Sequence, residues 1–183
     1  GFIHFDTGKY LESVVHDPAN KNNKEIQRER KMFDGGILLT PSWVLKVVRE
    51  KTEEISKAGF NITYSGSPRT IFEAFGDAKN TGLIEILEKL YGKKNIRVFY
   101  LKVSPKSSVF RNSNRKLCSV CGTGLMYTDI THKHTHCPIC DGKLRTRTLD
   151  KPEVIKVRLR EFKERTVPIL AGLKKRGYEI REI

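Results

Sequence analysis

The chain has 183 residues, of which 35 are Lys or Arg and 21 are Asp or Glu. The formal net charge of +14 predicts an anionic partner, such as a nucleotide or a nucleic acid. No stretch approaches the roughly 20 consecutive apolar residues that a membrane-spanning helix needs. The N-terminus carries neither the basic nor the apolar region of a secretory signal peptide. These features argue against a membrane protein, and we expect a cytoplasmic one.

Short apolar segments alternate with helical patterns along most of the chain. Gly35 and Gly36 end one helix, and Pro41, preceded by Thr40 as the expected N-cap, begins the next. The predicted elements are, in chain order, a strand at 2–5, a helix at 10–15, a loop at 17–24, a helix at 25–33, a helix from 41 that stops at Gly59, a strand at 60–64, a helix at 83–90, a buried strand at 96–103, a helix from 152 and a strand at 178–183. The helix from 41 is expected to bury Trp43, Val44, Val47, Val48 and Ile55. This alternation predicts an α/β fold with a parallel sheet flanked by helices.

Four cysteines form two close pairs, Cys118 with Cys121 and Cys137 with Cys140, separated by fifteen residues. Two residues between cysteines let both thiolates face one ion, and the four sulfur ligands suit a tetrahedral, structural zinc. Four unrelated free thiols are the alternative. Three histidines between the pairs are expected to be exposed loop residues and not ligands: His132, His134 and His136.

Three motifs occur in order in the first half of the chain. They are Asp6-Thr7-Gly8, the run from Asp34 to Thr40 (DGGILLT), and Gly66-Ser67-Pro68-Arg69-Thr70. A second set surrounds the cysteines. Two arginines four residues apart precede them, two arginines eleven apart follow, and a Thr-x-Pro comes last: Arg111, Arg115, Arg147, Arg158 and Thr166.

In order and spacing, these motifs resemble those of the adenylate kinases, specifically the bacterial form whose lid holds zinc. The resemblance implies that Arg69 holds the AMP phosphate and that Arg111 lies against the adenine of ATP. It also implies a catalytic set that spreads charge over the transferred phosphoryl group, consisting of Arg115, Arg147 and Arg158, the last two also contacting AMP. The implied AMP-binding residues further include Thr7, Ile37, Leu38, Leu39, Gly66 and Glu73. Arginine suits this task because its planar fork binds phosphate oxygens in pairs and stays protonated.

The resemblance implies a P-loop-kinase-like α/β core formed by 1–111 and 151–183, with a helical nucleoside-monophosphate-binding insertion at about 6–40. A small zinc-ribbon lid would comprise 112–150. The implied reaction is the reversible transfer of a phosphoryl group from Mg-ATP to AMP, which gives two ADP. Zinc in the lid and magnesium with ATP are the implied metals, and we expect a monomer.

The Gly-x-x-x-x-Gly-Lys-Ser/Thr loop of this family does not occur in the 183 residues. It would precede Gly1, and the family's last helix would follow Ile183. We therefore expect a fragment of a longer gene product that is inactive as it stands. A sheet without its central strand would also leave unpaired backbone groups, which predicts marginal stability.

Four positions depart from the family pattern. Glu12 stands where an arginine usually binds the AMP phosphate, and Ser65 replaces an aspartate that helps arrange magnesium. Glu73 replaces a glutamine that reads the AMP base, and a carboxylate accepts hydrogen bonds but cannot donate them. Leu149 replaces the first of two lid aspartates, and Asp150 keeps the second. The preferred nucleoside monophosphate therefore stays open.

Two alternatives belong to other classes of protein. The charge, the cysteine pairs and an aromatic residue such as Tyr127 are compatible with a zinc-ribbon nucleic-acid-binding protein. The basic residues are dispersed along the chain, however, so we do not expect nucleic acid as a partner. The departures at Glu12, Ser65 and Leu149 are compatible with a catalytically degenerate nucleotide-binding relative.

Overall fold

The computed structural model describes residues 1–146 and 150–183. The chain divides into two compact units. The first unit comprises 1–99 and 163–181, and the second comprises 100–162 and 182–183. Among the described residues, none of the helices combines the length and the apolar character that a membrane crossing requires.

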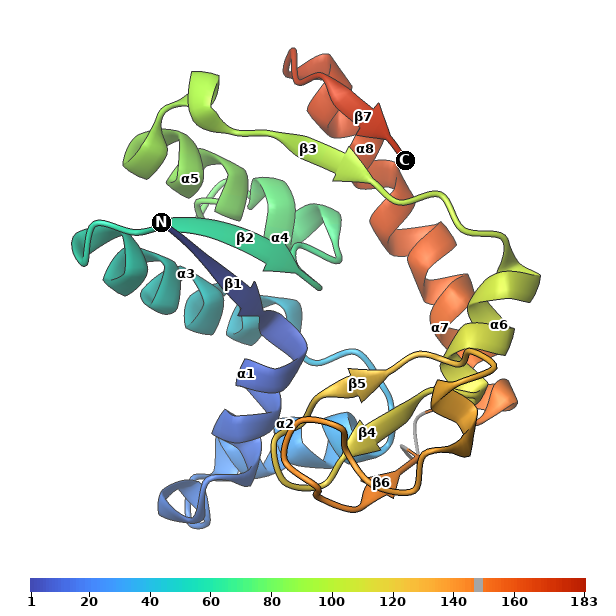
Figure 1. The fold of residues 1–183 in the computed structure, drawn as a ribbon. Helices are drawn as coiled ribbons and strands as arrows, with labels where there is room; N and C mark the ends of the chain where they lie inside the picture. The colour runs from blue at the N-terminus through green and yellow to red at the C-terminus, as the bar shows by residue number, and fades with distance from the viewer. Residues whose placement is uncertain (147–149) are drawn as a thin grey trace. The chain divides into compact units, whose positions relative to one another are not determined.

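The predicted alternation of helices and strands is present in the first unit (Figure 1). Up to the first glycine-rich turn, its elements are β1 (Phe2–Asp6), α1 (Thr7–His16), a 3-10 turn (Pro18–Asn20) and α2 (Lys24–Asp34). They continue with α3 (Pro41–Lys57), β2 (Asn61–Ser65), α4 (Ile71–Phe75), α5 (Leu83–Tyr91), a 3-10 turn (Lys93–Asn95) and α8 (Val167–Lys175). The predicted loop at 17–24 thus contains a short 3-10 turn and the first residue of α2.

Parallel pairing organises the strands. β1 and β2 run in parallel and lie alongside each other (Figure 1), with Phe2 opposite Asn61 and Asp6 opposite Ser65. β3 (Val98–Tyr100) pairs with β7 (Ile180–Glu182) in a second, separate two-stranded sheet. At the end of that pair the amide and carbonyl of one residue, Ile183, bond to two residues of the other segment, which is the parallel pattern. The predicted α/β class, with parallel strands flanked by helices, is confirmed.

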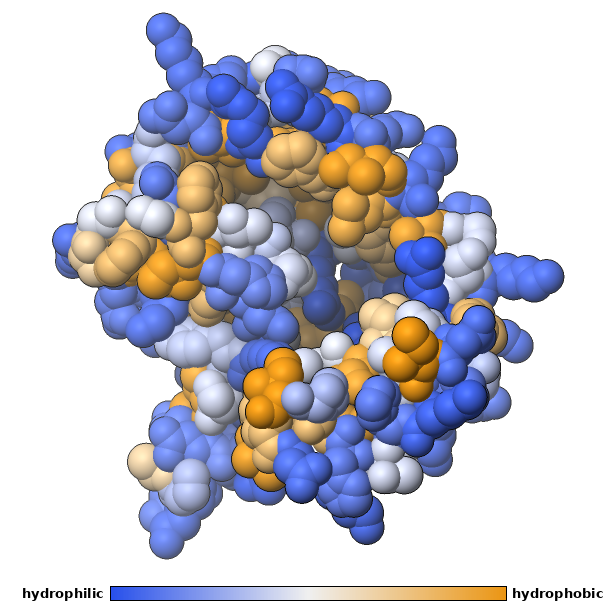
Figure 2. All heavy atoms as spheres, in the orientation of Figure 1, coloured by the Kyte–Doolittle hydropathy of each residue, from blue (hydrophilic) through white to orange (hydrophobic). Residues whose placement is uncertain are grey.

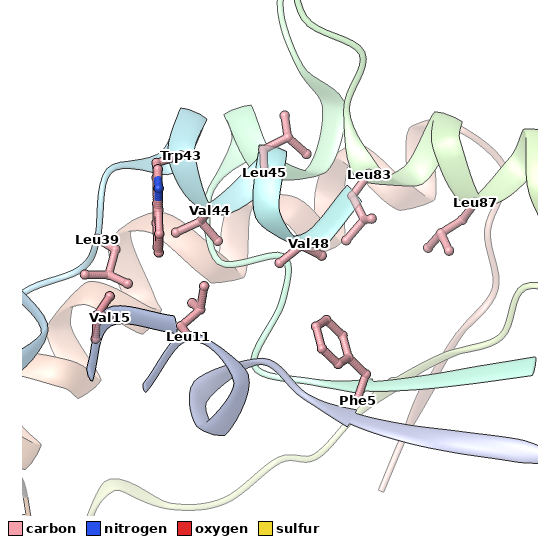
Figure 3. Close-up of a cluster of buried hydrophobic side chains, with 10 residues drawn as sticks. All are labelled: Phe5, Leu11, Val15, Leu39, Trp43, Val44, Leu45, Val48, Leu83 and Leu87. Carbon is pink, nitrogen blue, oxygen red and sulfur yellow. The ribbon is translucent and has the colours of Figure 1, made fainter. Parts of the chain in front are cut away.

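Two apolar clusters lie in the first unit, and the larger one forms most of its core. The inward faces of α1 and α3 meet Phe5 of β1 and the start of α5, as the labelled side chains of Figure 3 show. The buried members are Phe5, Leu11, Val15, Leu39, Trp43, Val44, Leu45, Val48, Leu83 and Leu87. The face predicted for α3 is therefore buried as expected, apart from Val47, which is half-buried at the margin of the cluster.

A buried carboxylate ties α2 to the start of α3. Glu29 has no exposed surface, and it accepts hydrogen bonds from the Thr40 amide at 2.8 Å and the Thr40 hydroxyl at 2.7 Å. The guanidinium of Arg28 donates a further hydrogen bond to the Glu29 carboxylate at 2.9 Å. Thr40 is the N-cap residue, as predicted, but its side chain makes no capping bond because its hydroxyl is used by Glu29. The sequence prediction did not anticipate this bond.

The segment 96–103 corrects one prediction. Only Val98–Tyr100 is a strand, and Phe99, Leu101 and Val103 are exposed, so the expectation of a buried strand is wrong. The reason is that successive side chains of a strand point to opposite faces: Val98 packs against a buried apolar cluster of the first unit, and Phe99, on the opposite face, is exposed.

Helix α8 approaches α4 closely within the first unit. A Cβ placed on Gly172 would lie 2.4 Å from the ring of Phe75, which is inside any normal contact distance. Arg176, the C-cap residue directly after α8, places its guanidinium carbon 4.6 Å from the centre of the same ring. At the beginning of α8, the Thr166 hydroxyl donates to the Arg69 carbonyl at 3.0 Å. Glycine at 172 is therefore what allows the backbone of α8 to lie against Phe75.

The second unit is built around small strands. Its described elements are α6 (Pro105–Ser113), β4 (Lys116–Cys118), β5 (Gly124–Leu125), a 3-10 turn (Thr131–Lys133), β6 (Leu144–Arg145) and α7 (Pro152–Glu161), followed by a π-helical segment, Phe162–Thr166, that continues into the first unit. The strands form an antiparallel sheet in the order β5-β4-β6. Its described side chains bury little apolar surface beyond Leu125 and Ile155. Figure 2 shows apolar residues interspersed with hydrophilic ones on the visible surface.

Replacing Glu29 tests the link between α2 and α3. Glu29→Ala leaves the Thr40 amide and hydroxyl without their acceptor in a buried site, and we expect a loss of about 3 kcal/mol in the free energy of unfolding. Urea unfolding followed by circular dichroism measures this loss. The matched control is Glu50→Ala on the exposed face of α3, which should change stability by less than about 0.5 kcal/mol. Equal stability of the two variants would contradict the role of Glu29.

Candidate functional site

Four cysteine sulfurs come together in the second unit. The Sγ atoms of Cys118, Cys121, Cys137 and Cys140 all lie within 4.8 Å of one another. Cys118 and Cys140 are 3.4 Å apart, and Cys121 and Cys137 are 3.7 Å apart. A tetrahedral ion with metal–sulfur bonds of about 2.3 Å would hold its ligands about 3.8 Å apart. The spacing and chemistry of the four thiols therefore fit a metal ion of that geometry.

The turns that carry the cysteines have unusual backbone conformations. Gly122 has φ +69° after the first pair, and Asp141 has φ +57° after the second. A Cβ on Gly142 would lie 2.8 Å from the Cys118 sulfur, so glycine is needed there for space. A hydrogen bond with the Thr123 side chain and, to a smaller extent, one with the Thr123 backbone lower the pKa of Cys121 to about 6. A lowered pKa favours the thiolate, which is the form that binds metals.

The histidines between the cysteine pairs hold the surrounding loop. The backbone carbonyls of His132 and His134 both accept from the Lys116 ammonium at 2.8 Å. His136 forms an antiparallel bridge with Lys143. In the part of the chain that the structure describes, the metal-competent group consists of the four cysteines.

Removing the metal should unfold this part of the chain. We expect the purified protein to contain one metal ion per chain by plasma mass spectrometry, and Cys121→Ser to lose it. A segment with so small an apolar core depends on its ion, so a chelator should lower the unfolding temperature of the second unit. Ser119→Ala, beside the cluster, should keep the metal. Unchanged metal content in Cys121→Ser would contradict the site.

A second group of predicted residues meets where β1 and β2 end in the first unit. Asp6 caps α1 by accepting from the Lys9 amide at 3.1 Å. A Cβ on Gly66 would lie 3.2 Å from Arg69 Nη2, 3.7 Å from the Thr7 Cβ and 3.9 Å from the Gly8 nitrogen. The structure thus brings a guanidinium, a hydroxyl-bearing residue and the N-terminus of a ten-residue helix around one glycine.

Thr7 is 1% exposed, and its hydroxyl has no hydrogen-bond partner among the described residues. An orphaned buried hydroxyl is costly unless something satisfies it. Helix N-termini and arginine forks both favour anions. The chemistry of this corner, formed by Thr7, Gly8, Gly66 and Arg69, therefore suits a phosphate-sized anion.

Glu73 supports the arginine of this corner. Its carboxylate accepts from the Arg69 amide at 2.8 Å and from the Thr70 hydroxyl at 3.1 Å. The Thr70 hydroxyl in turn accepts from the Glu73 amide, which caps the N-terminus of α4. Burial raises the pKa of Glu73, against the lowering effects of its bonds to Arg69 and Thr70. Glu73 therefore fixes the turn that presents Arg69.

The other predicted residues of the first unit occupy different environments. Ile37 is exposed, Leu38 is half-buried, and the Leu39 side chain belongs to the core. Ser65 pairs with His4 at 2.8 Å. Glu12 is half-buried on α1, where its carbonyl accepts from His16. The proposed contacts of these residues with AMP stay predictions.

In the second unit, the Asp150 carboxylate forms ion pairs with two of the predicted arginines. Arg115 donates to both Asp150 oxygens, at 2.7 and 3.0 Å, and Arg158 lies 3.9 Å from the same carboxylate. The Asp150 side chain is almost completely buried. Arg111 is exposed on α6. Arg147 and Leu149 lie outside the described residues. The roles proposed for these arginines stay predictions.

The role of the Asp150 carboxylate in pairing with both Arg115 and Arg158 was not predicted from the sequence. A single aspartate between two arginines is a weak indication on its own, since such charges are usually solvated. Its position directly before Lys151-Pro152, where α7 begins, becomes informative only after the fold is known. Thr166 was noted as part of a motif, and its bond to the Arg69 carbonyl gives that motif a structural function.

The raised pKa of Glu73 predicts an unusual pH dependence. Because the folded state binds this proton more readily than the unfolded state, the stability contributed by Glu73 is full below its unfolded pKa and is lost as the pH rises through the folded value. Glu73→Gln removes the titrating group, so its free energy of unfolding should fall less between mildly acidic and neutral pH. Urea titrations at several pH values measure the two slopes. Glu50→Gln serves as the exposed control, and equal slopes in wild type and Glu73→Gln would refute the expectation.

These observations define a class of protein: an α/β protein with a four-cysteine site suited to a metal and an anion corner at the ends of parallel strands. No protein-family model matches the chain. The adenylate kinase of Caldicellulosiruptor bescii is 31% identical over 178 residues, covering 95% of this chain and 76% of that protein. The adenylate kinase of Caldicellulosiruptor saccharolyticus is 30% identical over 184 residues, covering 97% and 77%. That of Borrelia garinii is 29% identical over 171 residues, covering 92% and 72%.

Identity at this level over nearly the whole chain shows the family. The chain belongs to the adenylate kinase family, and the resemblance drawn from its motifs is confirmed. Membership of this family supports a nucleotide phosphotransferase, and the cysteine cluster is compatible with the metal-binding lid of its bacterial form.

Proposed function

We propose that this protein is a nucleoside monophosphate kinase that transfers a phosphoryl group from Mg-ATP to AMP and gives two ADP. The observation that carries the proposal is the anion corner of Thr7, Gly8, Gly66 and Arg69. An arginine fork, a helix N-terminus and an orphaned hydroxyl all favour a phosphate group. The names of the relatives supply the rest of the proposal, namely AMP and ATP as the substrates.

Each arginine has a proposed task. Arg69 binds the AMP phosphate, held by Glu73 and Thr166 through its own backbone. In the second unit, Arg115 and Arg158 contact the phosphates of the reaction together with Arg147, and Arg111 lies against the adenine of ATP. Phosphoryl transfer needs positioning and neutralised charge more than covalent chemistry. The shared acceptor Asp150 would keep Arg115 and Arg158 close to each other before substrate arrives.

The metals have separate tasks in this proposal. Zinc would occupy the four-cysteine site and hold the strands β4, β5 and β6 together, because a closed set of four sulfurs leaves no open position for catalysis. Magnesium would arrive with ATP and neutralise phosphate charge. A lid comprising 112–150, a monomeric state and a location in the cytoplasm complete the proposal.

The corner is tested by the affinity for AMP. Isothermal titration calorimetry should give about 100-fold weaker AMP binding for Arg69→Ala, since two charge-assisted hydrogen bonds are lost. Adenosine, which lacks the phosphate, should bind wild type and variant equally. Thr7→Val should weaken AMP binding about tenfold by removing the hydroxyl. Arg49→Ala, an exposed arginine paired with Glu53 on α3, is the control and should bind AMP normally.

Two outcomes would overturn the proposal. One is AMP binding that survives Arg69→Ala, and the other is adenosine binding that weakens as much as AMP binding. Because the 183 residues contain no Gly-x-x-x-x-Gly-Lys-Ser/Thr motif, binding is the direct test for this chain. Turnover is measured separately, as ADP formed from Mg-ATP and AMP.

A further inference from the structure

Three aromatic rings form a continuous ladder on the second unit. Phe110, on α6, meets Tyr127 edge to face, with ring centres 5.4 Å apart. Tyr127 stacks on His132 with centres 5.3 Å apart and planes inclined by 30°. Phe110 is 52% exposed and Tyr127 is 40% exposed, and His132 is exposed as well. We call Phe110, Tyr127 and His132 the aromatic ladder.

The loop that carries the ladder is held in place by its own hydrogen bonds. Thr128 and Thr131 each accept, through their hydroxyls, from the backbone amide of the other, at 3.0 and 2.8 Å. The His132 ring pairs with the Thr128 carbonyl at 2.9 Å, and Lys116 holds the His132 carbonyl. A fixed loop presents its rings with little loss of conformational entropy on binding.

The charge around the ladder is positive. The second unit contains 13 Lys or Arg and 6 Asp or Glu, a formal net charge of +7. Lys106 lies one helical turn before Phe110 on α6, Arg111 follows Phe110, and Lys133 follows His132. Asp129 is the acidic residue between Tyr127 and His132. An exposed aromatic surface flanked by cations is complementary to bases linked by phosphates.

We propose that the aromatic ladder is a docking surface for single-stranded nucleic acid, a binding activity separate from the kinase reaction. The exposed faces of Phe110 and His132, at the two ends of the ladder, each stack a base. Lys106 and Lys133 contact the phosphates that join these bases. Paired bases in a duplex bury the faces that stacking requires, so the surface selects single strands.

The test uses the whole chain with its metal bound, and measures fluorescence anisotropy of a labelled oligouridylate of about 12 nucleotides. His132→Leu and Phe110→Leu should each weaken binding about tenfold, the value expected for losing one stacking contact. The matched control is Phe99→Leu on β3, an aromatic residue of the first unit that is 55% exposed. It should bind the oligomer as wild type does. Metal content checks that each variant keeps its fold.

A second variant tests the charges without touching the rings. Lys106→Gln with Lys133→Gln should make the slope of log affinity against log salt shallower by about 1.4, the contribution of two phosphate contacts to a single strand. An unlabelled single strand should displace the probe, and a duplex of the same length should not.

Three results would overturn the proposal. The first is binding by His132→Leu and Phe110→Leu equal to that of wild type. The second is displacement of the probe by the duplex as readily as by the single strand. The third is displacement by ATP together with a matching loss of ATP affinity in His132→Leu, which would assign the ladder to the nucleotide site of the kinase. AMP binding in the Arg69→Ala variant is independent of all three, so this proposal and the proposed function can fail separately.

Discussion

Parallel pairing of β1 with β2 is the constraint on which the candidate phosphate site depends. In that register Asp6 lies opposite Ser65, so both strands end at the same edge and the residues after each strand meet there. The Phe5 ring, which packs against Tyr10 and Tyr64, keeps the two ends together from the core side. A shift of one residue would turn Phe5 away from the core. It would also separate Thr7 from Gly66 and Arg69. The core and the site are therefore specified by the same register.

The second unit is stabilised in a different way from the first. Its short strands enclose few apolar side chains, and hydrophobic burial alone does not hold a segment of this size together. The Asp150 carboxylate joins Arg115 to Arg158, and the four sulfurs are arranged as ligands for a metal ion, so both features can act in place of a core. Interactions of this type are directional, so they fix geometry as well as stability. Because these polar interactions do not require a large buried apolar surface, the exposed residues of the second unit can be strongly basic.

Much of the architecture could be predicted from the sequence because local patterns and tertiary structure agree. The strands at 2–5 and 60–64, the end of a helix at Gly35–Gly36 and the start of α3 at Pro41 all lie close to where they were expected. The segment 96–103 failed because an apolar run indicates a strand without indicating how many neighbours cover it. The buried role of Glu29 and the pairing of Asp150 with arginines were missed for a related reason. Their importance comes from burial and from partners distant in sequence, Thr40 and Arg115, and composition carries no trace of either.

Gly172 lets α8 lie flat on the ring of Phe75, and Thr166 at the beginning of α8 holds the carbonyl of Arg69. Phe75 and Arg69 belong to the same short segment, so two separate attachments join that segment to α8. A bulkier residue at 172 would displace α8 from the Phe75 ring. The first residues of α8 would then move away from the turn that contains Arg69. Even the single methyl group of an alanine at 172 would thereby misalign the arginine, so the absence of one carbon atom sets how much change this helix tolerates.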